Sequence, residues 1–285
     1  MPTITTLTAD ARSRLVETTA RFFTDAELLQ WFIFAETDIA SKTECLEKIA
    51  SLSTVAYQQD YAFPTDYMDI EAILYENDTK LQDVDLRSWQ YKITGSPDST
   101  GDPEVYLPFR NKFRIYPPKA DNATTTTLNG AISDSATTIT VLDTTGFCGW
   151  GRIIIDSEVI SYTHITATTF LGCVRGDEGT TAAAHLTAAT VTERDLQVYY
   201  YNQPATMTAG GDTPSIPAQY HELLVLYAVA IALKKDNKWQ EGNNYYQEYT
   251  RGLNLMIDEI TSKYRDKLSC IKDEEQFNES QNGII

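Results

Sequence analysis

Four residues of this chain have the types that hold a zinc ion in proteins. They are Cys148, His164, Cys173 and His185. Structural zinc sites usually take their ligands in close pairs along the chain, and these four residues form no such pair. We therefore interpret them as core cysteines and surface histidines, and the sequence predicts neither a metal nor a cofactor.

Asp156 and Glu158 flank Ser157 between two predicted strands. Paired carboxyl groups carry out glycosidic hydrolysis, so these two acids, with Asp177 and Glu178 further along, are candidates for glycan binding or cleavage. A tight hairpin turn with solvated acids explains the same pattern more simply.

Two further patterns have a chemical and a structural interpretation. Asp212, Ser215 and His221 have the residue types of a nucleophilic triad. Because the Asp and the Ser lie in a Pro-rich loop, we interpret them as turn formers and helix caps.

The tyrosines at 199–201 have rings that could stack on nucleobases, but their lack of basic neighbours favours a half-buried strand. No phosphate loop, dinucleotide fingerprint, nucleophile elbow or zinc-protease helix occurs in the sequence, so we predict that the protein is not an enzyme.

The charge balance excludes one class of function. The 285 residues include 23 Lys and Arg against 40 Asp and Glu, which gives a formal net charge of −17. A protein that binds nucleic acid by itself neutralises phosphates with a basic surface, so this balance excludes that role. The 42% of hydrophobic residues is typical of a folded globular protein.

The cysteines and the apolar runs indicate where the protein is made. Four scattered cysteines without a CxxC pair are typical of free thiols in a reducing compartment. The N-terminus lacks the pattern of a secretory signal. Residues 223–233 are the longest apolar run, with 11 residues, whereas a membrane span needs about 20. We therefore predict a protein made in the cytoplasm that does not contact a membrane.

Residues 1–118 have a mixed α and β pattern. Thr24 and Glu27 have the spacing of a capping box, which predicts the start of a long helix with Trp31 on its apolar face. Alternating and β-branched residues predict a strand over 67–75 and a hairpin over 109–116.

Residues 119–193 have a different composition. They are rich in Thr, contain no Lys after Lys119 and include β-branched runs separated by Gly, which predicts a small all-β domain. The runs on either side, residues 113–116 and 196–201, are expected to pair in one sheet. The β domain is therefore predicted to be an insertion at a hairpin tip.

Two helices are predicted in the last part of the chain. A run that is apolar nearly all round predicts a buried helix over 218–235, and spacings of three and four predict another over 239–267. The acidic residues 269–285 are predicted to form a flexible C-terminal segment. The predicted fold is α+β: a helical bundle core with a small antiparallel sheet, formed by residues 1–118 and 194–268, plus the inserted all-β domain.

Four stretches, residues 23–40, 61–70, 113–118 and 196–228, resemble the head-to-tail adaptor, or connector, proteins of tailed bacteriophages. They read FTDAELLQWFIFAETDIA, YAFPTDYMDI, FRIYPP and LQVYYYNQPATMTAGGDTPSIPAQYHELLVLYA. The residues of this pattern that we single out are Trp31, Pro64, Pro214, Pro217, Tyr220 and His221. In the β domain, IIIDSEVISY followed by GCVRGDEGTTAAAH is similar to a small β module that decorates phage structural proteins.

The resemblance implies a structural protein of the virion neck that forms a ring of about twelve copies between the portal vertex and the tail. Its expected partners are the portal protein, a tail nozzle or tail-tube protein, other copies of itself, and tail fibres through residues 119–193. Double-stranded DNA would pass through the ring without specific binding. A tail-completion or fibre-attachment component, and a glycan-binding adhesin or hydrolase, are the alternatives.

The C-terminal segment has a role in this hypothesis. It would fold on binding the portal protein and place apolar side chains in apolar sites there. The side chains expected to do so are Ile271, Phe277, Ile284 and Ile285.

Overall fold

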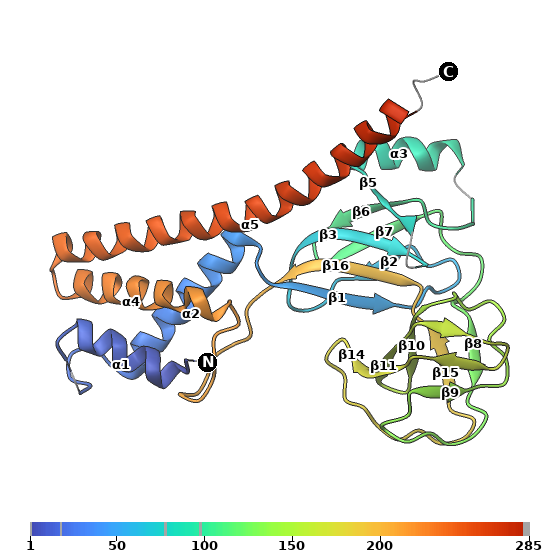
Figure 1. The fold of residues 1–285 in the computed structure, drawn as a ribbon, viewed down its shortest axis with the longest axis horizontal. Helices are drawn as coiled ribbons and strands as arrows, with labels where there is room; N and C mark the ends of the chain where they lie inside the picture. Colours follow the sequence, from blue (N-terminus) through green and yellow to red (C-terminus); the bar gives the residue numbers. More distant parts are fainter. Residues whose placement is uncertain (1, 18, 77–78, 97–98, 282–285) are drawn as a thin grey trace. The chain divides into compact units, whose positions relative to one another are not determined.

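The computed structural model describes residues 2–17, 19–76, 79–96 and 99–281, and from residue 263 onward it describes the backbone alone (Figure 1). The helices are α1 (Ile4–Arg14), α2 (Asp25–Thr43), α3 (Leu86–Gly95), the short 3-10 helix η1 (Ala218–Tyr220), α4 (His221–Lys235) and α5 (Trp239–Gln281). The strands of the first half are β1 (Glu47–Leu52), β2 (Asp60–Ala62), β3 (Tyr67–Tyr75), β4 (Thr79–Lys80), β5 (Gln82–Asp83), β6 (Val105–Phe109) and β7 (Lys112–Tyr116). The later strands are β8 (Thr125–Thr127), β9 (Thr138–Thr140), β10 (Gly151–Ile155), β11 (Glu158–Tyr162), β12 (His164–Ile165), β13 (Thr169–Leu171), β14 (Val174–Asp177), β15 (Thr190–Glu193) and β16 (Leu196–Asn202).

The chain divides into two compact units, Met1–Leu46 with Gln203–Ile285, and Glu47–Asn202. The first contains α1, α2, α4 and α5, and the second contains the strands and α3. We call them the helical unit and the β unit. This combination confirms the predicted α+β class.

The capping box at the start of α2 is present as predicted. The Thr24 hydroxyl accepts a hydrogen bond from the Glu27 amide at 3.2 Å, and the Glu27 carboxylate accepts one from the Thr24 amide at 3.1 Å. These bonds satisfy amides that have no partner inside the first helical turn. The helix that follows buries Leu28, Phe32 and Ile39 completely.

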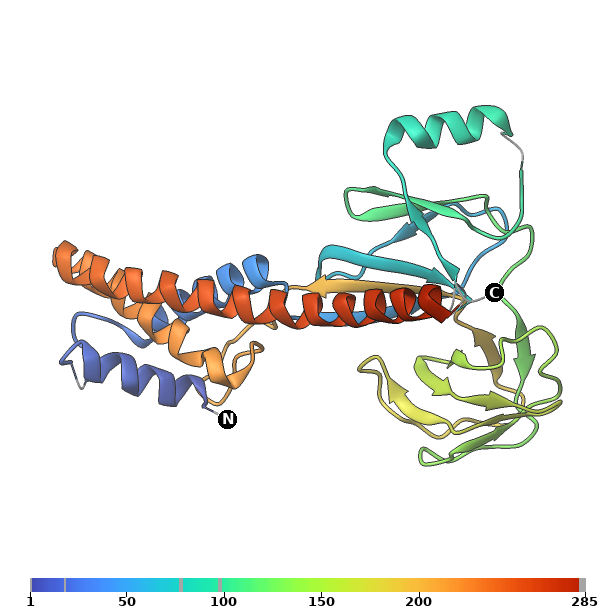
Figure 2. The same ribbon diagram turned by 45° about the horizontal axis from the view of Figure 1, so that its top comes forward.

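Helix α4 is the centre of the helical unit. It contacts α1, α2 and α5, and Figure 2 shows these helices gathered beside the N-terminal half of α5. Because it has neighbours on several sides, α4 needs apolar residues nearly all round, and this explains its sequence. Leu224, Val225 and Val229 are completely buried there. No helix in the described ranges is both long and apolar enough to cross a membrane.

Two sheets form the larger part of the β unit. Their strand orders are β1-β16-β3-β4 and β2-β7-β6-β5. The predicted pairing of residues 113–116 with residues 196–201 is wrong, because β7 pairs with β2 and β6, whereas β16 pairs with β1 and β3. The two strands still meet, since Ile115 of β7 and Val198 of β16 lie in the same hydrophobic cluster. Aromatic and β-branched residues fit hydrogen bonding within a sheet and packing between sheets equally well, so local sequence does not distinguish the two.

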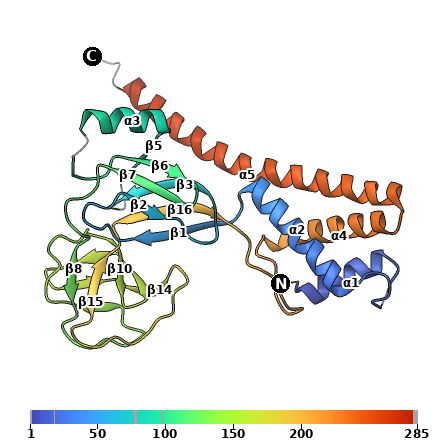
Figure 3. The same cartoon turned by 180° about the vertical axis from the view of Figure 1, so that it is seen from behind.

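Residues 119–193, which we call the β module, are fully described and contain no helix. Their strands form sheets of order β14-β11-β10-β15-β8 and β12-β13-β9, and Figure 3 labels β8, β10, β14 and β15 among them. The module has its own hydrophobic cluster, which includes Ile153 and Phe170. Its two ends are adjacent, because the Glu193 amide donates to the Thr124 carbonyl at 2.8 Å.

The structure differs from the prediction at the end of the chain. Helix α5 does not end at residue 267 but continues to Gln281, so residues 269–281 of the predicted flexible segment are helical. Ile284 and Ile285 lie outside the described residues, and the side chains of Ile271 and Phe277 lie outside the described part of α5.

Candidate functional site

The acids at 156 and 158 lie at the turn between β10 and β11, as the sequence predicts. Asp156 has a φ of 54°, in the left-handed region. Its side chain is 68% exposed, whereas the side chain of Glu158 is 1% exposed. The prediction of two solvated acids is therefore correct for Asp156 and wrong for Glu158. Ala183 and His185, both in the segment that follows β14, lie against the Glu158 carboxylate.

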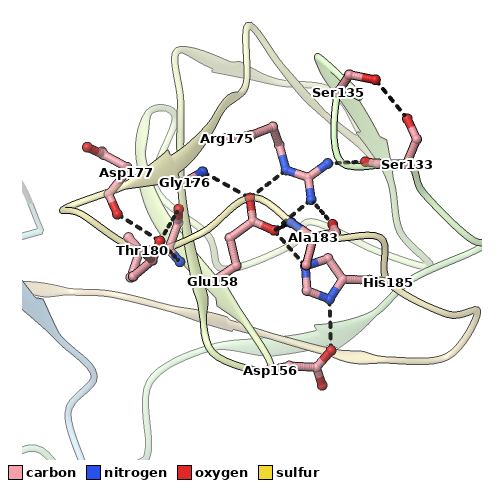
Figure 4. A network of polar contacts seen from close by, with 11 residues as sticks. Ser133, Ser135, Asp156, Glu158, Arg175, Gly176, Asp177, Thr180, Ala183 and His185 are labelled. Atoms are coloured by element: carbon pink, nitrogen blue, oxygen red, sulfur yellow. Dashed lines mark hydrogen bonds and ion pairs between the residues drawn. The ribbon is translucent and has the colours of Figure 1, made fainter.

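Glu158 is surrounded by hydrogen-bond donors (Figure 4). Arg175 donates to both of its oxygens, from Nε at 2.8 Å and from Nη2 at 2.7 Å. The amides of Gly176 and Ala183 donate at 2.9 and 3.0 Å. His185 completes the set with Nε2 at 2.8 Å.

These donors fix the charge of Glu158. Burial by itself raises the pKa of a carboxyl group, but the bonds from Arg175, the Ala183 amide, His185 and the Gly176 amide outweigh burial and lower the pKa of Glu158 to about 2. A carboxylate that is ionised and already saturated with donors is neither a proton donor nor a free nucleophile. The geometry therefore argues against glycosidic hydrolysis at Asp156 and Glu158.

His185 was predicted to lie on the surface, and this prediction is wrong because its side chain is 3% exposed. Nδ1 lies 2.8 Å from Asp156 Oδ2, and Nε2 lies 2.8 Å from Glu158 Oε2. A neutral imidazole has one N–H and donates to one of these carboxylates, whereas the imidazolium donates to both. Each ring nitrogen of His185 therefore lies within hydrogen-bond distance of a carboxylate oxygen.

Arg175, which sequence reasoning missed, extends this network to the segment of Ser133. It donates to the Ser133 carbonyl and, at 2.6 Å, to the Ala183 carbonyl. Among Lys and Arg, residues 120–192 contain only Arg152 and Arg175. This scarcity is the signal that could have identified Arg175, because a buried guanidinium requires acceptors. The network of Figure 4 therefore holds the segment between β14 and β15 against β11.

The residue types of a zinc site are not assembled in the structure. In the described ranges no group of three or more His, Cys, Asp or Glu is arranged to hold a metal ion. His164 is exposed. Burial raises the pKa of Cys173 to about 11, and burial together with Glu193 raises the pKa of Cys148 to about 12. Both thiols are therefore protonated at neutral pH, and a protonated thiol is a poor metal ligand.

The three residues considered as a triad have separate structural partners. Asp212 accepts from the Thr208 and Ala209 amides at 2.7 and 2.9 Å, which makes a turn. The hydroxyl of Ser215 accepts from the Ala205 amide at 3.1 Å. His221 donates from Nε2 to the Ile216 carbonyl at 3.0 Å. The interpretation of Asp212 as a turn former is confirmed.

Glu36 organises this loop from helix α2, and sequence reasoning missed it. Its side chain is buried and accepts hydrogen bonds from the amides of Ser215 and Ile216. Burial raises the pKa of Glu36, although the two amides act in the opposite direction. The only signal in the sequence is a Glu next to the apolar face of α2, between Ala35 and Ile39.

The residues singled out from the adaptor pattern occupy structural positions. The ring of Trp31 lies edge-on to Phe23, with the centroids 6.3 Å apart. The Pro64 carbonyl accepts from the Tyr67 amide, and the Pro217 carbonyl accepts from the Tyr220 amide at the start of η1.

Two further residues of the pattern fix the loop before α4. Pro214 is buried, and the Tyr220 hydroxyl donates to Glu259 of α5 at 2.5 Å. Together with the His221 bond, these contacts hold the loop on the helical unit.

Residues 2–268 match the family described as SU10 adaptor protein. The chain belongs to the SU10 adaptor protein family. No curated protein was found to match the chain.

Membership of this family of phage adaptors makes the protein a structural component of the bacteriophage virion. The match includes both the helical unit and the β unit. In this adaptor, Glu158 and Asp212, which looked capable of chemistry, bind the backbone amides of nearby loops. The tyrosines at 199–201 are part of strand β16, with Tyr200 buried and its hydroxyl donating to Asp66 at 2.9 Å.

Proposed function

We propose that this adaptor forms a ring that joins the portal vertex of the capsid to the phage tail and continues the DNA channel. The match of residues 2–268 to the SU10 adaptor family carries the proposal. The ring contains about twelve copies, the number of subunits in the closed symmetry expected at a portal. The portal protein binds one side, and a tail nozzle or tail-tube protein binds the other.

The net negative charge of the chain supports the proposal that DNA passes through the ring. At −17 per chain, a ring of copies has a strongly negative field. Double-stranded DNA carries dense negative charge and is repelled from such a surface. The genome therefore slides through without specific binding.

Exposed apolar side chains of the helical unit support the proposed contacts between neighbouring subunits of the ring. Phe34 of α2 is 51% exposed, and Trp239 and Leu255 of α5 are 60% and 61% exposed. Subunit interfaces are enriched in aromatic and large apolar residues, because their burial contributes most of the binding free energy.

The C-terminal end attaches the ring to the portal in this proposal. Ile271, Phe277, Ile284 and Ile285 supply the apolar anchors of residues 269–285. A chain truncated after Leu268 should still form the helical unit but no longer attach to the portal. Unchanged attachment of the truncated chain would contradict this role.

Native mass spectrometry of the full chain mixed with its portal ring tests the proposal. The expected product is a discrete complex with one adaptor copy per portal subunit, and a portal that stays bare would contradict it. A double variant, Trp239→Ser with Leu255→Ser, should lose the complex. Leu186→Ser is the matched control, because Leu186 is 80% exposed but lies in the β module.

A further inference from the structure

Strand β1 lies at the edge of its sheet. In the described part of the chain its one strand partner is β16, paired antiparallel from Glu47 opposite Tyr201 to Leu52 opposite Leu196. The other side of β1 therefore presents backbone groups that no strand of the described chain takes up. Edges of this kind are sites where another extended chain can add.

The backbone groups on that side can be identified. The Ser51 amide donates to the Glu178 carboxylate at 2.9 Å, so it faces away from β16. In an antiparallel pair the amides of alternate residues face the same side. The amide of Ile49, two residues earlier, therefore faces the open edge as well.

Glu178 determines how much of the edge is open. Its φ is 54°, and its side chain is 10% exposed and lies 3.2 Å from Arg152. The carboxylate takes the place at Ser51 that the carbonyl of an added strand would occupy. An incoming chain can therefore pair with β1 at Ile49 but not at Ser51.

A pocket of about 540 Å³ adjoins this part of the edge. Its lining consists of Glu47, Lys48, Ile49, Glu71, Arg152, Asp177, Glu178, Gly179 and Tyr199. The acids outnumber the bases, and both bases are already paired within the β unit, Lys48 with Asp66 at 2.6 Å and Arg152 with Asp177 at 3.0 Å. The remaining charge of the pocket is therefore negative.

Glu71 is an acid of this pocket and forms no ion pair in the described ranges. It lies at a bulge of β3, because Tyr199 pairs with Ala72 and Tyr200 pairs with Ile70. A bulge redirects the side chain of the extra residue, and such positions often occur beside binding sites. Glu71 is exposed and lines the pocket next to β1.

We propose that the open edge of β1 binds an extended basic segment of another virion protein, which pairs with the backbone of Ile49 and places a Lys or Arg in the pocket lined by Glu71. The backbone pairing provides the binding site, and the acidic pocket selects the charge of the partner. A second copy of this chain, with a net charge of −17, is disfavoured at the same surface. The inference is independent of ring size and of which side of the ring meets the portal.

Binding of a probe peptide to the full chain tests the proposal. The probe is acetyl-Val-Lys-Val-Lys-Val-amide, and the matched control peptide has Glu in place of Lys. NMR titration should shift the Ile49 amide with the basic peptide, with an affinity at least about tenfold higher than for the acidic one. Equal affinities, or shifts that leave Ile49 unaffected, would overturn the proposal.

Two variants locate the site. Glu71→Lys should weaken binding of the basic peptide by about tenfold or more, which corresponds to about 1.4 kcal/mol. Asp134→Lys makes the same charge change at an exposed residue outside the pocket and should leave the affinity within about twofold. Equal effects of the two variants would show a general charge effect and refute the site.

Ile49→Pro removes the amide proposed to pair, and Pro is tolerated at an edge where the N–H faces outward. It should abolish binding with an otherwise unchanged amide spectrum. If this variant fails to fold, Glu71→Lys still decides the question. Concentration-dependent dimerisation of the wild type that Ile49→Pro removes, without binding of the basic peptide, would instead identify a second copy as the occupant and overturn the proposal.

Discussion

Glu158 is the residue whose behaviour differs most from its local sequence. It stands two residues after Asp156, yet one acid is exposed and the other is buried among Arg175, His185 and backbone amides. A buried charge is stable only when partners replace its hydration. The contacts of Glu158 therefore act on the stability of the β module.

Replacing Glu158 by Gln should destabilise the β module by about 3 kcal/mol, because Arg175 and His185 would stay buried without their partner. Hydrogen exchange of peptides from β10 and β11 measures this loss locally. Asp156→Asn is the matched control and should cost less than about 1 kcal/mol, since Asp156 is mostly exposed. Equal costs for the two variants would contradict the assigned role.

The contribution of Glu158 should also depend on pH. Its pKa is lowered from 4.5 to about 2 in the folded chain. A lowered carboxyl pKa means that the stabilisation is complete above pH 4.5 and is lost as the pH falls towards about 2. The stability difference between the wild type and Glu158→Gln should therefore shrink over this range. Taking the difference removes the effects of other acids, and a constant difference down to pH 2 would refute the linkage.

At the scale of elements, Gly242 allows the backbones of α4 and α5 to approach closely near Ala230. A Cβ added at Gly242 would lie 2.8 Å from the Ala230 carbonyl oxygen and 2.9 Å from Lys234 Cγ. The backbone oxygen cannot move away without displacing α4. Gly242 therefore sets the distance between the two helices at this end of the bundle.

Gly242→Ala should destabilise the helical unit by about 2 kcal/mol through overpacking, although Ala is the better helix former. The matched control is Gly211→Ala in the same unit, where an added Cβ meets nothing within 4 Å. Urea unfolding followed by helical circular dichroism compares the two. A Gly242→Ala chain as stable as the wild type would show that α4 can shift at no cost.

At the scale of the whole molecule, the adjacent ends of the β module determine what its removal should do. Thr124 and Glu193 are joined by a backbone hydrogen bond of 2.8 Å, so a short Gly linker can replace residues 125–192. The buried contact of Asp195 with Thr54 lies outside the deleted segment and would hold the remaining strands.

The chain that lacks residues 125–192 should fold and attach to the portal as the wild type does. It should fail to retain tail fibres, because residues 119–193 are proposed to bind them. Electron microscopy of assembled particles checks both outcomes. Fibres that remain attached would contradict the docking role, and a chain that does not fold would show that the module is required for the rest of the β unit.

The sequence by itself determined the features that depend on neighbouring residues. The capping box of Thr24 and Glu27, the apolar faces of α2 and α4, and the all-β character of residues 119–193 follow from patterns within a few residues, and the structure confirms them. Helical and extended backbones repeat over short distances, so short patterns are enough to predict them.

Only the tertiary structure decided the contacts between distant residues. Glu178 reaches Ser51 across 127 positions, and Glu36 reaches Ser215 across 179. The placement of β7 and β16 in different sheets, and the burial of Glu158 and His185, are of the same kind. The local sequence around a lone acid or a β-branched run does not predict which distant amide or strand it contacts, because that contact depends on how the whole chain packs.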